Sequence, residues 1–279
     1  MNMARGISGA GSMTTSRRPA LRPWWFLAIT LGWSWTFWWF AAWSGGSWAD
    51  PLPFALFVLG GSGPLLSAAL LLRVAGRGQT ERDFWRRVFD VRRVRPHWWV
   101  LVAVVALLPS VLGRAVMGGE GPWLAPGAAL VLVTAVVAGV LEEPGWRGYA
   151  LDALSDRHGA VAAAAIVGAV WALWHLPLFF LVGSYQHGLG RWSTGFWLFM
   201  VVLLALSFVY AAVYFATGRS ILAVVVLHAA ANAAGELVSV SGQRSAEALV
   251  TLAMAAVAIL LLPRQVRRGR TPMSGRPSR

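Results

Sequence analysis

Three stretches of this sequence place polar and ionisable side chains within long apolar runs. They are VLEEPGWRGYALDAL at 140–154, WALWHLPLFF at 171–180 and VVVLHAAANAAGE at 224–236. A charge inside a membrane is costly unless it is paired or hydrated, so each such residue is a candidate for function. The candidates are Glu142, Glu143, Arg147, His175, His228 and Asn232.

The spacing of the two adjacent glutamates predicts different roles for them. On a helix, Glu143 and Arg147 are four residues apart and share a face, whereas Glu142 is rotated by about 100°. We therefore expect Glu143 to pair with Arg147, and Glu142 to point into the bundle. His228 and Asn232 are also four residues apart, so their side chains lie on one stripe of a helix.

Together these side chains supply the parts of a hydrolytic site. A carboxylate can take a proton from water, and a histidine can orient that water. Imidazole and amide N–H groups can then stabilise a developing oxyanion. Alternatively, Glu and His side chains can bind a zinc ion that activates the water.

Structural interpretations compete with this one. A lone buried histidine such as His175 is often a hydrogen-bonded core residue, and His228 with Asn232 can link helices. Glu143 with Arg147 can be a structural ion pair even within a catalytic site. Glu142 is the hardest to explain structurally, and the presence of all three clusters in one small protein favours a site.

The composition defines the class of protein. Of 279 residues, 57% are hydrophobic and 13% charged, which is outside the range of soluble domains. The net charge of +13 comes from arginines alone, as GC-rich bacterial codons would give. The absence of cysteine excludes disulfides and thiolate metal sites. We expect an integral membrane protein with the lipid bilayer around it and no nucleic-acid partner.

Apolar runs of roughly 18–23 residues predict the membrane-spanning elements. The fold class that they indicate is all-α, a bundle of about eight transmembrane helices. The runs lie at about 24–43, 51–73, 98–117, 123–141, 160–182, 195–217, 220–238 and 245–263.

The distribution of arginine predicts that both termini are cytoplasmic. With that orientation, all but three of the 24 arginines lie on the cytoplasmic side, as the positive-inside rule requires. We divide the chain into a cytoplasmic N-terminal tail at 1–23, a transmembrane domain at 24–263 and a basic cytoplasmic tail at 264–279. The arginines on the other side are Arg114, Arg191 and Arg244.

The segment ERDFWRRVFDVRRVRPHWW, between the second and third runs, predicts an amphipathic helix on the cytoplasmic leaflet. Its apolar face contains Phe84, Trp85, Val88, Phe89 and Val91. Its basic residues are expected to face anionic headgroups, unless they form only a solvated face. These residues are Arg86, Arg87, Arg92 and Arg93.

The three polar stretches resemble the motifs of a known family. EEPGWRG is similar to an EExxxRG motif, WALWH has an aromatic residue four positions before a histidine, and HAAAN matches HxxxN. In this order they resemble the CPBP family, which comprises type II CAAX prenyl endopeptidases and the bacterial Abi bacteriocin-processing and immunity proteins. The resemblance covers 125–240 and implies eight transmembrane helices around a cavity reached from the cytoplasm.

The resemblance also implies a role for each candidate. Glu142 would be the general base that activates water, and His175 would help to position that water. His228 and Asn232 would form the oxyanion site, while the ion pair of Glu143 and Arg147 would hold the cavity in shape.

The sequence departs from the family pattern at Pro144 and Gly145, where aliphatic or aromatic residues are more usual. Because proline often kinks a helix, it puts the orientation of the glutamates in question. Family members are often labelled metalloproteases. We expect no required cofactor, with zinc held by Glu142, His175 and His228 as the alternative.

The sequence therefore predicts a multi-pass intramembrane endopeptidase of the plasma membrane. Its substrate would be a membrane-associated peptide or protein, cleaved near the cytoplasmic face. Two alternatives remain. One is a proton-coupled transporter that uses Glu142 and the histidines as a relay, and the other is a non-catalytic membrane scaffold or immunity protein.

Overall fold

The computed structural model describes residues 22–75, 78–118, 128–238 and 243–270, and these residues contain helices and no strands. Both predicted tails lie largely outside these ranges. The helices are α1 (Pro23–Trp43), α2 (Pro51–Gly61), α3 (Gly63–Val74), α4 (Gly78–Phe89), η1 (Val91–Arg93), α5 (Pro96–Met117), α6 (Ala128–Glu143), η2 (Pro144–Leu151), α7 (Asp152–His158), α8 (Ala160–Trp174), η3 (Leu176–Phe180), α9 (Tyr185–Leu189), α10 (Thr194–Ala216), α11 (Ile221–Leu237) and α12 (Arg244–Arg270).

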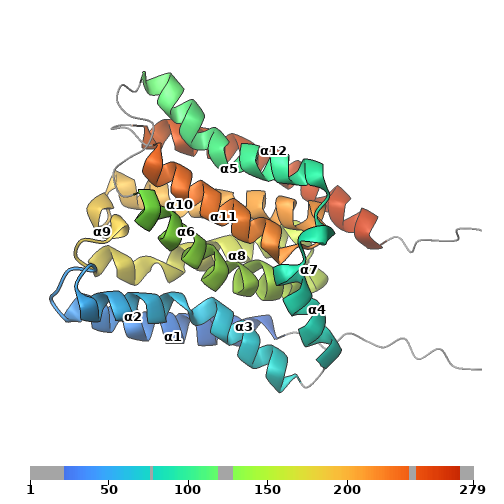
Figure 1. Cartoon of the computed structure of the whole chain (residues 1–279), viewed down its shortest axis with the longest axis horizontal. Helices are drawn as coiled ribbons and strands as arrows, with labels where there is room; N and C mark the ends of the chain where they lie inside the picture. The colour runs from blue at the N-terminus through green and yellow to red at the C-terminus, as the bar shows by residue number, and fades with distance from the viewer. Residues whose placement is uncertain (1–21, 76–77, 119–127, 239–242, 271–279) are drawn as a thin grey trace, which may run out of the picture.

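The long helices pack in three layers (Figure 1). Helices α5 and α12 form one outer layer, and α1, α2 and α3 form the other. Between them lie α6, α8, α10 and α11, with α6 against α11 and α8 against α10. All three polar stretches belong to this central layer, so the fold places the candidate site inside the bundle.

Every predicted apolar run is mostly helical where the structure describes it, which confirms the all-α membrane fold. By length and composition, five described helices can cross a membrane, and a sixth can if α2 and α3 form one span. Helix α11 is shorter than these spans. The count of eight crossings and the cytoplasmic location of both termini stay predictions, although α1 begins and α12 ends toward the same end of the bundle (Figure 1).

The second predicted run is bent rather than straight. Helices α2 and α3 meet at an angle of 42° around Ser62. Here the chain passes very close to α1, since a Cβ on Gly63 would lie 2.3 Å from the Ser34 hydroxyl oxygen. Pro64, which lacks an N–H, also begins the new helix. The glycines allow this close packing, and the proline favours the break.

The inner face of α4 differs from the prediction. Arg87 does not face headgroups, because its side chain turns into the protein with Phe84 and Val88 and is only 8% exposed. Its Nη1 donates hydrogen bonds to Asp152 Oδ2 at 2.7 Å and to the Tyr214 hydroxyl. Burial alone would lower the pKa of Arg87, but Tyr214 and Asp152 outweigh it and raise the pKa, so the guanidinium stays charged.

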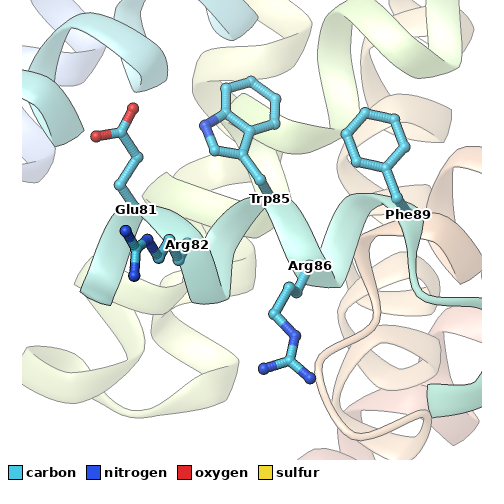
Figure 2. Close-up of a pocket in the computed structure, with 5 residues that line it drawn as sticks. All are labelled: Glu81, Arg82, Trp85, Arg86 and Phe89. Atoms are coloured by element: carbon cyan, nitrogen blue, oxygen red, sulfur yellow. The ribbon is translucent and has the colours of Figure 1, made fainter. Parts of the chain in front are cut away.

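The outer face of α4 keeps the predicted amphipathic character. Trp85 and Phe89 point to one side of the helix and Arg86 to the other (Figure 2). Arg86, Arg92 and Arg93 are exposed as expected, and Arg93 also donates to the Gly218 carbonyl oxygen at 3.0 Å. Helix α4 is thus clamped to the end of the bundle and leaves one side open.

Candidate active site

The first motif, EEPGWRG, lies at the junction of α6 and the wider π-helix η2. Helix α6 continues without a break through the π-helix η2 and into α7, so Pro144 does not interrupt the span Ala128–His158. A proline ring clashes with the carbonyl four residues earlier in a regular α-helix, and a π-turn relieves that clash. Gly145 allows close packing here, since a Cβ would lie 2.4 Å from the carbonyl oxygen of Pro64.

Glu143 lies at the centre of a buried cluster. Its Oε1 accepts a hydrogen bond from Arg147 Nη1 at 2.9 Å and another from His228 Nδ1 at 2.7 Å. Glu143 and Arg147 are fully buried. The predicted pairing with Arg147 is confirmed, and the contact with His228 on α11 is an additional finding.

Arg147 also stacks between two aromatic rings. Its guanidinium carbon lies 4.5 Å from the ring centre of Trp171 and 4.7 Å from that of Tyr210. A cation over an aromatic face is stabilised by the ring quadrupole, more strongly when water is excluded. These contacts fix the guanidinium and tie η2 to α8 and α10.

Glu142 points away from this ion pair and has a different partner. Its Oε2 accepts a hydrogen bond of 2.7 Å from the indole N–H of Trp171, and the residue is 7% exposed. The two adjacent carboxylates therefore contact different groups, as the spacing predicts. Glu142 is bound by a neutral donor, whereas Glu143 is held by a cation and a histidine.

His175 lies where α8 tightens into the 3₁₀-helix η3, two residues before Pro177. Its backbone N–H donates to the Ala172 carbonyl, three residues earlier, rather than to the carbonyl of Trp171. The Trp171 oxygen instead accepts a hydrogen bond from the His175 ring nitrogen Nδ1 at 2.8 Å. Because a carbonyl only accepts, Nδ1 carries the proton, and Nε2 of a neutral ring is an acceptor.

Asn232 lies one turn beyond His228 on α11 and is exposed. Within the part of the chain that the structure describes, its amide makes no hydrogen bond to the other candidates. The structure therefore brings five of the six candidates into one linked cluster and leaves Asn232 at its edge.

Two aromatic residues belong to this cluster although the sequence did not mark them as site residues. Trp171 contacts Glu142, Arg147 and His175, and Tyr210 packs its ring 5.8 Å from that of His228. The helical spacing of Trp171 and His175 is a signal that could have identified the tryptophan. Tyr210 lies in a long apolar helix with no comparable signal.

The alternative zinc set does not assemble in this structure. Among the described residues, no three His, Asp or Glu side chains come together in a group that could hold a metal ion. Glu142, His175 and His228 therefore do not form a ligand set in this arrangement. A zinc site needs three or four ligands at about 2.0–2.3 Å.

The fold and the cluster define a class of protein. A polytopic helical membrane protein with two carboxylates, two histidines and an arginine at its centre has the groups needed for acid–base chemistry. Structural ion pairs explain only part of the cluster, because Glu142 stands apart from the ion pair.

Comparison with known proteins agrees with the resemblance that the motifs carry. Residues 123–234 match the family model described as type II CAAX prenyl endopeptidase Rce1-like. The chain is also similar to CAAX prenyl protease 2 of Methanococcus maripaludis, with 26% identity over 215 residues that cover 73% of this chain and 79% of the relative. Both matches support a CPBP-type protease embedded in the membrane.

Proposed function

We propose that the protein hydrolyses peptide bonds by means of a water molecule activated by Glu142. The observation that carries this proposal is the separation of the two carboxylates. Glu143 is hydrogen-bonded to Arg147 and His228, whereas the donor that binds Glu142, among the described residues, is the neutral indole N–H at Oε2. A carboxylate that is not hydrogen-bonded to a cation keeps its capacity to accept a proton.

The hydrogen bonds indicate which atoms would hold the water. Oε2 of Glu142 and Nδ1 of His175 both bind Trp171, so Oε1 of Glu142 and Nε2 of His175 are assigned to the water. Both atoms accept hydrogen bonds when the carboxylate is ionised and the imidazole is neutral. The water would donate one proton to each, which leaves an oxygen lone pair for attack.

The reaction then proceeds in two steps, attack by the water and cleavage of the C–N bond. The water oxygen forms a bond to the peptide carbonyl carbon while Glu142 takes the proton, giving a tetrahedral intermediate. The C–N bond breaks as Glu142 returns that proton to the leaving nitrogen. The products are a carboxylic acid and an amine, and Glu142 is ionised again.

His228 would stabilise the oxyanion together with Asn232. Because Nδ1 of His228 donates to Glu143, donation from Nε2 to an oxyanion requires a proton on both ring nitrogens. The adjacent Glu143 carboxylate favours that imidazolium charge. Asn232 lies one turn further along α11 and would supply the second donor to a peptide that lies along this helix.

The substrate would be a membrane-associated peptide, cleaved near the cytoplasmic face of the plasma membrane. The name of the archaeal relative supports a prenylated CAAX peptide as the first candidate. A quenched fluorescent farnesylated CAAX peptide and its unprenylated counterpart, both in liposomes, would test this class. Preference for the prenylated peptide would support the proposal, and equal turnover would overturn the prenyl requirement.

We propose that this hydrolysis requires no metal, in keeping with the absence of a ligand group among the described residues. Purified enzyme in liposomes should keep full activity in the presence of a chelator and contain no stoichiometric zinc by elemental analysis. Loss of activity in chelator that zinc alone restores would overturn this part of the proposal.

The decisive test is Glu142→Gln, which keeps the size of the side chain and removes the base. We expect turnover of a membrane peptide to fall by about 10²–10⁴-fold, the range that general acid–base catalysis contributes. Thermal unfolding in detergent should stay close to wild type. Full biological activity in a stably inserted variant would refute the protease mechanism and favour a scaffold.

A further inference from the structure

Trp171 is in contact with both groups assigned to the water. Its indole N–H donates to Glu142 Oε2 at 2.7 Å, and its backbone carbonyl accepts from His175 Nδ1 at 2.8 Å. Glu142 comes from α6 and His175 from the end of α8. One residue therefore fixes the relative positions of two side chains on different elements.

The carbonyl of Trp171 can accept the hydrogen bond from His175 Nδ1 because Pro177 follows two residues after the histidine. In a continuous α-helix it would accept the N–H of the residue four positions later. Pro177 favours the tighter 3₁₀ turn, in which the His175 N–H bonds to Ala172 instead. The His175 ring can thus fold back onto the Trp171 oxygen.

The indole ring is held firmly in its place. Trp171 is 2% exposed and packs against the Arg147 guanidinium, with the rings of His228 and Tyr210 at centroid distances of 5.8 and 5.9 Å. A side chain packed on all sides keeps one rotamer, so its N–H points in a fixed direction.

We propose that Trp171 is a positioning residue that aligns Glu142 and His175 on one water through its indole N–H and its carbonyl oxygen. This inference rests on the proposed function. An aromatic residue at this place need not donate a hydrogen bond, since phenylalanine is also aromatic and has no side-chain donor. The tryptophan adds a donor that favours the ionised form of the base.

The test is Trp171→Phe with Trp146→Phe as the matched control. The phenylalanine at position 171 keeps the backbone carbonyl and an aromatic ring, and it removes the N–H. Trp146 is equally buried, and its indole N–H has no hydrogen-bond partner among the described residues. The control therefore has the same change in volume without loss of a hydrogen bond.

We expect Trp171→Phe to lower kcat by about tenfold with little change in KM, since a hydrogen bond to a charged group has about this effect. The acidic limb of kcat against pH should move to higher pH by about one unit, because the carboxylate loses a donor that favours its ionised form. Equal kcat values and pH profiles for Trp171→Phe and Trp146→Phe would overturn the inference.

A second substitution separates the hydrogen bond from packing if Trp171→Phe folds poorly. Benzothienylalanine at position 171 has the shape of tryptophan with sulfur in place of the N–H. It should reproduce the fall in kcat and the shift in pH while melting like wild type, and wild-type kinetics would count against the inference. Glu142→Gln in the same assay separates the two proposals, because an active Glu142→Gln enzyme refutes the mechanism itself.

Discussion

Two buried charge clusters in this protein differ in how their charges are balanced. At the end of the bundle, Arg87 and Arg219 both bind Asp152, at 2.7 and 3.1 Å, and Arg87 also pairs with Asp83. At the centre, Arg147 and His228 both bind Glu143, at 2.9 and 2.7 Å, and Glu142 is an additional carboxylate.

The difference separates a structural role from a chemical one. In the outer cluster each carboxylate is paired with two arginines, since Arg93 also lies 3.6 Å from Asp83, and Asp83 is largely exposed to solvent. Its effect is to clamp α4 onto α7 and α10. In the central cluster, among the described residues, Glu142 is hydrogen-bonded to the neutral Trp171 indole rather than to a cation, which a purely structural network would not need.

The largest effect is expected for Arg147→Met in the central cluster. The substitution leaves the fully buried Glu143 with only His228 as a charged partner. Breaking a buried pair by removal of one partner costs about 3–5 kcal/mol of unfolding free energy. Thermal unfolding in detergent and peptide turnover should both collapse, whereas Arg73→Met, on the exposed end of α3, should leave both within experimental error. A variant that melts like wild type would contradict the buried ion pair.

A smaller effect is expected for Asp152→Asn in the outer cluster. Arg87 and Arg219 lose their shared carboxylate but keep an amide oxygen as an acceptor. Loss of the charge-assisted bonds should lower the unfolding free energy by about 1–3 kcal/mol. Turnover per folded molecule should stay within about twofold of wild type, since this cluster has no role in the proposed chemistry. A large fall in kcat at unchanged stability would show that the two clusters are coupled.

The smallest effect is expected for Arg86→Gln on α4, whereas its neighbour Arg87 should be about as sensitive as Asp152. Arg87→Gln removes a buried guanidinium with three polar partners and should lower the unfolding free energy by about 1–3 kcal/mol. Arg86→Gln changes an exposed side chain and should stay within about 0.5 kcal/mol. Equal melting temperatures for the two variants would show that Arg87 is solvated and that α4 is not clamped.

The helices and the pairing of Glu143 with Arg147 were predictable because they depend on local periodicity. Apolar runs locate the helices, and a spacing of four residues pairs Glu143 with Arg147 without any knowledge of the partner helices. The contact of His228 with Glu143 joins residues 85 positions apart, and no local pattern indicates it. The inward turn of Arg87 was missed for the same reason, since Asp152 lies on another helix.

The sequence by itself determined that this is a helical membrane protein with motifs that resemble those of the CPBP family, because hydrophobic run length and motif spacing are properties of the chain. The tertiary structure decided which groups touch. It turned Arg87 inward, placed the indole of Trp171 on Glu142 and put both His228 and Arg147 on one oxygen of Glu143. Inside a membrane a polar group is stable only with a partner, and the packing of helices far apart in the chain selects that partner.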